Sequence, residues 1–271
     1  MTDSHILSVL EKETLKNIVI LKLLRQFPQM NVLSSSRDTD YALLLVLPTQ
    51  ASSFYSQLYP WSEHVLFPVA TDLSLLQPLV EPHLEEKVMF AIADSGIVET
   101  IHAATPLTKL RSYISYTSKK ITNSENTDAV KMSDNFSPEC SELFKANNYS
   151  QQELDTFAGW GGKTFSITTE EGMIASACFI FPNYGDIWEI AGVHTIDRQR
   201  RRGYAKQVIL KAAAYILGQR KIVRYQTEHK NLVSQNLAES IGLHKFLELS
   251  HYAAKIHTNQ DKYIHELRNL K

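Results

Sequence analysis

A basic segment containing a glycine stands at the start of a strongly helical stretch and is the first candidate for chemistry. Its residues are Arg200, Arg201, Arg202, Gly203, Tyr204 and Ala205. A helix N-terminus exposes unpaired backbone N–H groups and the positive end of the helix dipole, which together favour a phosphate. Gly203 lets the backbone approach phosphate oxygens closely, and the arginines add charge and hydrogen-bond donors. The segment therefore predicts an anion site, the alternatives being a solvated basic run or a nucleic-acid contact.

A second helical segment carries polar residues at its start. It begins at Asn231, includes Ser234 and stops before Gly242. Asn and Ser are typical N-cap residues, and a glycine commonly follows the last helical residue. One interpretation is that Asn231 and Ser234 only cap the helix, and the other is that they also contact a ligand.

Together these two segments resemble the motifs of the GNAT superfamily of N-acetyltransferases. The family signature Q/R-x-x-G-x-G/A lies between its fourth strand and third helix, and Arg200-x-x-Gly203-x-Ala205 matches it. The segment from Asn231 to Leu243 resembles the second family motif, in which a helix after the fifth strand flanks the coenzyme A arm. The resemblance covers roughly residues 128–255, about half of the chain.

The resemblance implies acetyl-CoA as cosubstrate and no metal. The pyrophosphate is expected at residues 200–205, and Asn231 and Ser234 are expected beside the coenzyme A arm. The pantetheine arm is expected along the end of the preceding strand, at Val193, His194 and Thr195.

The resemblance also implies a catalytic base. In many family members a Glu of the fourth strand accepts the proton of the amine, and Glu189 stands fourteen residues before Gly203, at the matching distance. Strand alternation places Glu189, Ala191 and Val193 on one face. The alternative is an exposed Glu near the start of the strand.

The proton donor is less well matched. The family often places a Tyr in the second-motif helix, where this chain has Leu237-Ala238-Glu239. We take Tyr252 as the candidate donor, with Tyr225, His194 and Ser234 as alternatives.

Aromatic residues stand in the segments that bind the acceptor in this family. Trp160 and Tyr184 are the candidates for contact with the acceptor, and core packing is the alternative role of each.

These residues need a scaffold, and the second half of the chain predicts one. Three strands separated by turn residues, 163–168, 173–181 and 186–195, read as a meander. A helix over 203–217, a strand over 222–226 and a helix over 231–241 follow. The expected fold is α/β, with a mixed, mostly antiparallel central sheet flanked by helices, preceded by a smaller α/β amino-terminal domain.

The first half shows a helical pattern over 6–24, strand-like runs, a helix capped by Asp72 and a last helix over 106–113. We divide the chain into a first domain (1–116), a linker (117–127), the acetyltransferase domain (128–257) and a tail (258–271). The first domain is interpreted as a degenerate GNAT-like copy. It lacks the basic turn and is not expected to bind CoA. It is expected instead to close the acceptor pocket or to mediate a homodimer.

Composition narrows the class of protein. The net charge of −1 and pI near 6.8 give no overall attraction to nucleic acid or anionic lipid. Two cysteines, Cys140 and Cys178, favour neither a disulfide scaffold nor a zinc site. The sequence shows no signal peptide or stretch long enough to span a membrane, so a cytoplasmic protein is expected.

The predicted function is direct transfer of an acetyl group from acetyl-CoA to a primary amine of a small molecule. The alternative is a CoA-binding regulatory or scaffold protein whose catalysis is weak or lost. Nucleic-acid binding through residues 198–206 is disfavoured, since no aromatic side chains interleave with the basic ones.

Overall fold

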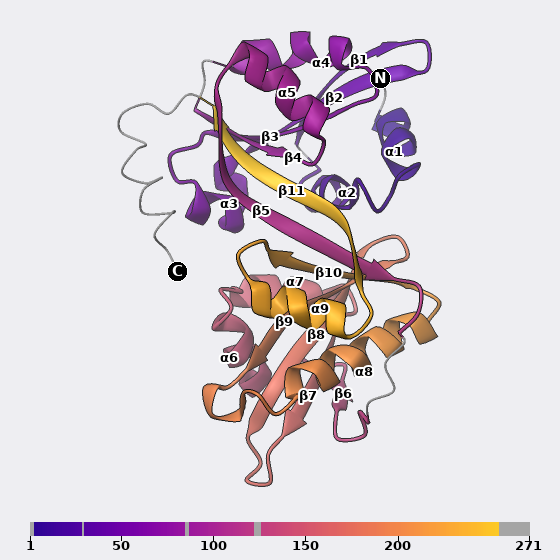
Figure 1. The fold of residues 1–271 in the computed structure, drawn as a ribbon, viewed down its shortest axis with the longest axis vertical. Helices are drawn as coiled ribbons and strands as arrows, with labels where there is room; N and C mark the ends of the chain where they lie inside the picture. The colour runs from indigo at the N-terminus through magenta and orange to yellow at the C-terminus, as the bar shows by residue number, and fades with distance from the viewer. Residues whose placement is uncertain (1–2, 29, 85–86, 122–125, 255–271) are drawn as a thin grey trace. The chain divides into compact units, whose positions relative to one another are not determined.

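The computed structural model describes residues 3–28, 30–84, 87–121 and 126–254 (Figure 1). The chain forms two compact units. The first contains residues 1–113 and the chain from Glu248 onward, and the second contains Ile114–Leu247. Two strands, β5 (Leu107–Ser118) and β11 (His244–Ala254), have residues in both units. The division therefore falls inside strands, whereas the sequence analysis places it in a linker, and the predicted tail at 258–271 lies outside the described residues.

The second unit is a sheet with the strand order β10-β9-β8-β7-β6, and the end of β5 lies beside β10. Its strands are β6 (Lys131–Ser133), β7 (Lys163–Thr168), β8 (Ile174–Tyr184), β9 (Ile187–Thr195) and β10 (Ile222–Glu228). Its helices are α6 (Pro138–Lys145), α7 (Gln151–Gly159), α8 (Tyr204–Gly218) and α9 (Leu232–Ser240). The pair β9–β10 is parallel, whereas β6–β7, β7–β8 and β8–β9 are antiparallel. The predicted mixed, mostly antiparallel sheet is confirmed.

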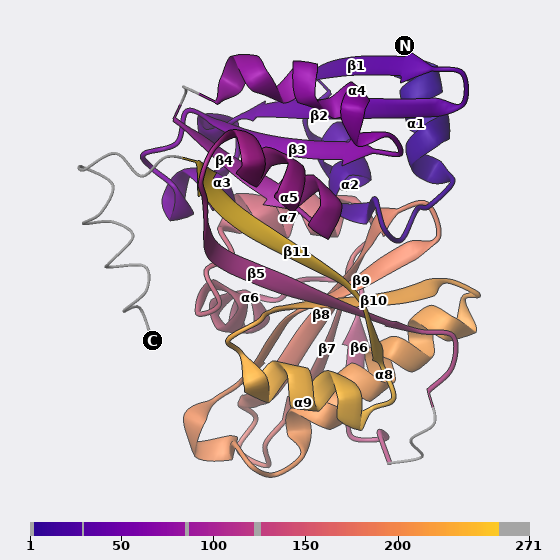
Figure 2. The ribbon, with the colours of Figure 1, turned by 45° about the horizontal axis from the view of Figure 1, so that its top comes forward.

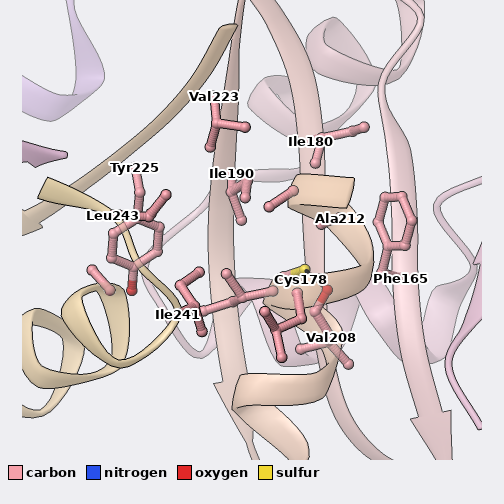
Figure 3. Close-up of a cluster of buried hydrophobic side chains, with 14 of the residues drawn as sticks. Phe165, Cys178, Ile180, Ile190, Val208, Ala212, Val223, Tyr225, Ile241 and Leu243 are labelled. Atoms are coloured by element: carbon pink, nitrogen blue, oxygen red, sulfur yellow. Dashed lines mark hydrogen bonds between the residues drawn. The ribbon is translucent and has the colours of Figure 1, made fainter. Parts of the chain in front are cut away.

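Helices cover both faces of this sheet (Figure 2). On one face, Val208 and Ala212 of α8 pack on Cys178, Ile180 and Ile190 (Figure 3). On the other face the side chains of α6 and α7 pack on Ala177, Phe179, Phe181 and Ala191. Small alanines along α8 let the helix lie close to the strands, and burial of its apolar stripe stabilises it.

Local signals set the helix boundaries in this unit. The Ser137 hydroxyl accepts a hydrogen bond from Cys140 N at 3.2 Å, and Ser150 and Glu153 form a capping box at the start of α7. After α9, Leu243 N donates to Ala238 O at 3.1 Å around Gly242, whose φ is +89°. Ser137 therefore caps α6, and the predicted terminating glycine at 242 is confirmed.

The first unit has the strand order β1-β2-β3-β4-β11, and the start of β5 lies beside β11. Its further strands are β1 (Asn31–Arg37), β2 (Asp40–Pro48), β3 (His64–Ala70) and β4 (Val88–Ile92). Its helices are α1 (Asp3–Glu11), α2 (Ile18–Gln26), α3 (Ser53–Leu58), α4 (Leu73–Val80) and α5 (Ser95–Ala104). As in the second unit, one neighbouring pair, β3–β4, is parallel, and the predicted Asp72 cap of α4 is present.

The order of elements repeats between the two units. Two helices, three strands, a helix, a strand, a helix and a strand occur as α1-α2-β1-β2-β3-α4-β4-α5-β5 and again as α6-α7-β7-β8-β9-α8-β10-α9-β11, apart from short additional elements. This repetition supports the interpretation of the first half as a second copy of the same fold. Each unit also contains part of the final strand of the other copy.

One prediction in the first half is wrong. Residues 106–113 are not a helix but the beginning of β5, and the helix is α5, which Asp94 caps through Gly96 N at 2.9 Å. The leucines of the segment suggested a helix, but its polar and apolar residues pair as a strand instead. The amino-terminal helical pattern is divided into α1 and α2, and the Asn17 side chain between them donates to Leu10 O at 2.9 Å.

A bulge in β9 changes the direction of its side chains. Ala191 pairs with Phe179, but His194 pairs with Ala177, so Gly192 and Val193 together oppose Cys178. Gly192 has a φ of +62°. The predicted alternation fails at Val193, which packs with Ile190 on the α8 face while Ala191 faces α6 and α7, because the extra residue reverses the face.

We expect Gly192→Ala to lower the free energy of unfolding by about 2–4 kcal/mol, from overpacking and an unfavourable φ together. A Cβ at this position would lie within 2.6 Å of the Phe179 ring. Gly185→Ala is the control, because its φ of +53° is similar and nothing lies within 4 Å of the added Cβ. Urea unfolding of both variants measures the difference, and equal losses would contradict the role of the Phe179 contact.

Candidate functional site

The parallel strands β9 and β10 are paired over only part of their length. The pairs run from Ile187 with Ile222 to Ile190 with Tyr225, although β9 continues to Thr195 and β10 to Glu228. The bulge at Gly192 follows directly after the last pair in β9. The backbone of β9 beyond Ile190 is therefore not paired with β10, and an extended ligand can pair with an unpaired strand edge.

The turn after β9 leads into α8 without a side-chain cap. Gly203 is the N-cap residue with a φ of +78°, and a glycine has no side chain with which to cap the helix. Arg201 also has a positive φ, +63°. A left-handed conformation at a non-glycine residue costs about 1–2 kcal/mol, and such residues cluster at functional sites. This helix end can accept an anion.

The arginines of this turn differ in their surroundings. Arg200 folds back, its Nε donating to Thr195 O at 3.3 Å and its Nη2 lying 2.7 Å from Asp197 Oδ1. Arg201 and Arg202 are exposed, as is Gly203, whereas Tyr204 and Ala205 are half-buried in the first turn of α8. All six residues of the predicted anion site therefore lie in one continuous segment, and all three of its arginine side chains are exposed.

The candidate base lies at the point where the strands part. Glu189 precedes the last pair, and its side chain is buried against β10, where Arg224 is its register partner. Arg224 Nη1 and Asn183 Nδ2 both donate to Glu189 Oε2. Arg224 Nη2 donates to Ser115 Oγ at 3.0 Å. The alternative of an exposed Glu is therefore not what the structure shows.

Arg224 and Asn183 were not found by sequence reasoning. The available signal was a charged residue in the middle of an apolar strand in each of two successive strands, Glu189 in WEIAG and Arg224 in IVRYQ. Buried charges are usually paired, so one acidic and one basic strand residue suggest each other as partners. Tyr149 was also missed. Burial and, next, the Glu189 carboxylate raise the pKa of this phenol.

The strand residues predicted to bind the cofactor arm lie at the end of β9 that is not paired with β10. Asn147 Nδ2 donates to Val193 O at 3.1 Å, and Asn147 Oδ1 lies 3.3 Å from His194 Nδ1. Thr195 Oγ1 lies 2.9 Å from Ser176 Oγ. Burial and, next, Arg200 lower the pKa of His194, so this ring is neutral at pH 7.

At the start of α9, Asn231 has the capping role that was one of its two interpretations. Its Oδ1 accepts from Ser234 N at 3.0 Å. The Ser234 side chain lies close to Tyr225, the last paired residue of β10. Burial raises the pKa of Tyr225 to about 12, and the Ser234 hydrogen bond acts in the opposite direction. A neutral phenol and a serine hydroxyl are thus close to the point where β9 and β10 part.

Tyr252, the predicted donor, belongs to the first unit. It pairs with Phe90 of β4 and packs on an apolar cluster that includes Leu44 and Leu66. Glu189 belongs to the second unit. The structure therefore does not place Tyr252 in the unit that contains the predicted anion site.

The two candidate acceptor residues have different neighbours. Trp160 caps the end of α7, and its ring lies 5.8 Å from Phe157 and 6.3 Å from Phe181, edge-on and tilted. Tyr184 ends β8 opposite Ile187, one residue after Asn183. Trp160 is partly buried on the α6–α7 face, the face that carries Ala191.

The described residues include no group of three or more His, Cys, Asp or Glu side chains that could hold a metal ion. Cys140 and Cys178 are buried and form no disulfide. None of the helices in the described ranges is both long enough and apolar enough to cross a membrane.

Comparison with known proteins gives a family match to the second half of the chain. The model of the acetyltransferase (GNAT) family matches residues 130–243. No curated protein matches the chain.

Solved structures show a similar fold over most of the chain. A Drosophila protein has a TM-score of 0.62 at 12% identity, covering 94% of this chain and 97% of its own. A GCN5-related N-acetyltransferase from Kribbella flavida has a TM-score of 0.55 at 12% identity, covering 91% and 96%. A tandem GNAT protein from the clavulanic acid biosynthesis pathway has a TM-score of 0.52 at 10% identity, covering 88% and 87%.

We expect Asn231→Ala to lower the free energy of unfolding by about 1 kcal/mol, the usual contribution of an N-cap side chain. Asn231→Asp is the matched control, because a carboxylate can accept the same bond from Ser234 N and should retain most of the stability. Urea denaturation measures both, and an alanine variant as stable as the wild type would contradict the capping role.

Proposed function

Residues 130–243 of this chain form a domain of the acetyltransferase (GNAT) family, and we propose that the protein transfers an acetyl group from acetyl-CoA directly to a primary amine. The observation that carries the proposal is the uncapped N-terminus of α8, which follows the strand that separates from its parallel neighbour. An anion site beside an unpaired strand edge suits a ligand with a pyrophosphate and an extended amide-containing arm.

The residues present fit coenzyme A. The N–H groups at the start of α8 and the exposed side chains of Arg201 and Arg202 would hold the pyrophosphate. The pantetheine arm would lie along β9 at Val193, His194 and Thr195, between that strand and the start of α9. Ser234 is the residue of α9 that we assign to the arm, while Asn231 contributes by capping the helix.

Glu189 is proposed as the base. Transfer requires an uncharged amine, which attacks the thioester carbonyl carbon. The nitrogen–carbon bond forms, the carbon–sulfur bond breaks, and the proton lost by the nitrogen passes to the Glu189 carboxylate directly or through a water molecule. The products are the N-acetylated amine and the free thiol of coenzyme A.

Tyr225 is proposed as the proton donor to the leaving thiolate, in place of Tyr252. Its phenol is neutral at physiological pH, because burial raises its pKa to about 12, and Ser234 lies close to it. It ends the paired part of β10, next to the proposed thioester position. The tyrosine missing from α9 is thus replaced by one from the neighbouring strand.

The acceptor is proposed to be a small-molecule amine that enters on the α6–α7 face of β9. Glu189 and Ala191 face this side, and Trp160 and Tyr184 are the proposed contacts at its edge. Aromatic side chains around a carboxylate are suited to an amine with an apolar substituent.

We expect Gly203→Asp to weaken acetyl-CoA binding about tenfold or more, because a carboxylate at the N-cap of α8 satisfies the N–H groups and repels phosphate. Gly203→Asn is the matched control, since it has the same size and tolerates a positive φ without the charge. Isothermal titration calorimetry measures both affinities. Equal affinities for the Asp and Asn variants would contradict an anion site at this helix end.

We expect Glu189→Gln to lower kcat roughly 10²–10⁴-fold without a large change in the KM for acetyl-CoA, because general base catalysis contributes about that much. Thiol release from acetyl-CoA is measured over a panel of primary amines, with Glu99→Gln, at an exposed position of α5 in the first unit, as control. Unchanged turnover in Glu189→Gln would exclude Glu189 as the base. Acetyl-CoA binding by the wild type without turnover of any amine would favour a binding protein over an enzyme.

A further inference from the structure

The two copies of the fold can be aligned residue by residue around their parallel strand pairs. In the first unit Pro48 pairs with His64, and His64 pairs with Val88. In the second unit Pro182 pairs with Trp188, and Trp188 pairs with Val223. The last pairs, Leu66 with Phe90 and Ile190 with Tyr225, occupy equivalent places and face the equivalent helices, α4 and α8.

This alignment makes Val65 the counterpart of Glu189, and Met89 the counterpart of Arg224. Val65 and Met89 are register partners and are both fully buried. The position that holds a charged pair in one copy therefore holds an apolar pair in the other. The same strand geometry forms with either, so the fold does not require the ion pair.

Two other features of the second unit, the bulge in β9 and the helix start without a side-chain cap, are also missing at the equivalent places of the first unit. The pairing of β2 with β3 continues from Ala42–Ala70 to Pro48–His64 without a bulge. The N-terminus of α4 is capped by Asp72, whose carboxylate accepts from Ser74 N at 2.9 Å, whereas that of α8 has no side-chain cap. The bulge, the open helix end and the buried ion pair thus occur together in the copy that matches the family model.

The two oxygens of the Glu189 carboxylate differ in their hydrogen bonds. Both described hydrogen bonds, from Arg224 and Asn183, reach Oε2, and none within the described residues reaches Oε1. About 10% of the Glu189 side chain remains exposed, whereas Arg224 is almost completely buried, at 1%. One oxygen is therefore held in place and the other is available to a proton.

We infer that Arg224 is a positioning residue for the reaction, which anchors Glu189 through Oε2 so that Oε1 is the oxygen that accepts the proton of the amine. This inference rests on the proposed function. The guanidinium also compensates a carboxylate charge that burial would otherwise disfavour. Ser115, which accepts from the other terminal nitrogen of Arg224, fixes the guanidinium in turn.

The buried pair of Glu189 and Arg224 is a costly way to fill this position of the sheet, which favours a functional role over a structural one. Removing two charges from water is costly, and replacing a buried ion pair by apolar residues of similar volume is often neutral or stabilising. Removing one partner alone leaves an uncompensated buried charge and is strongly destabilising. The first unit supplies the apolar replacement for this position, Val and Met.

The test uses four variants of the full chain: Glu189→Val combined with Arg224→Met, Arg224→Met alone, Arg224→Lys, and Lys221→Met. Lys221 is the matched control. Its side chain, like that of Arg224, forms an ion pair with a carboxylate, that of Asp186, but this pair lies on the surface. Thermal unfolding, acetyl-CoA affinity, and kcat and KM with a reactive amine are measured for each.

The double variant is expected to keep its thermal midpoint within about 3 °C of the wild type and to bind acetyl-CoA normally, with turnover lowered roughly 10²–10⁴-fold. Arg224→Met alone is expected to lower the midpoint by roughly 10 °C and kcat by at least about tenfold, with the KM for acetyl-CoA little changed. Arg224→Lys should restore most of kcat, and Lys221→Met should change neither midpoint nor kcat.

A double variant that fails to fold or to bind acetyl-CoA would show that the pair serves the structure, and an Arg224→Met variant with wild-type kcat would remove its positioning role. If the proposed function is wrong, the result is different: the wild-type protein itself turns over no amine. In that case the unfolding measurements still decide whether the fold needs the pair, since a destabilised double variant overturns the inference without any activity assay.

Discussion

The end of backbone pairing between β9 and β10 is the constraint on which the second unit depends. After Ile190 and Tyr225 the two strands no longer pair with each other, although β9 stays paired with β8, and backbone groups that leave a ladder need other partners. The bulge at Gly192 gives β9 the local kink and twist that accompany this departure. The open start of α8 and the Tyr225–Ser234 contact both lie beside the opening that results. A fully paired β9–β10 ladder would leave no strand edge for a ligand.

The proposed site of this protein is built from features that are unfavourable for the fold taken alone. A left-handed Arg201, an uncapped helix start and a buried ion pair each have a more stable substitute, and the first unit contains two of these substitutes, an Asp cap and a Val–Met pair. The comparison between copies separates what the sheet and helices require from what a ligand requires. Such a separation is not available in a chain with a single copy of its fold.

Hydrophobic periodicity, together with capping and turn residues, predicted the helices and strands of the second unit well. The strands around Phe179, the caps at Ser137 and Asn231 and the turn at Gly203 each follow from local sequence. The face of Val193 could not be predicted, because one bulge residue reverses the alternation. The partner of Glu189 was also missed, since Arg224 lies thirty-five positions away and is placed by parallel register. The division of the chain inside β5 and β11 could not be predicted from the sequence, because the pairing of these strands depends on residues far away in the chain.

The placement of β11 in the first unit has a consequence for synthesis on the ribosome. Residues Ser250–Ala253 of β11 pair with β4, so the first unit lacks one strand of its sheet until the second unit has been synthesised. Pairings between residues so distant in sequence form slowly, and a waiting β4 presents an open edge. The amino-terminal half therefore cannot finish folding as it emerges, although domains generally fold in that order. Completion of both halves is tied to translation of the last strand.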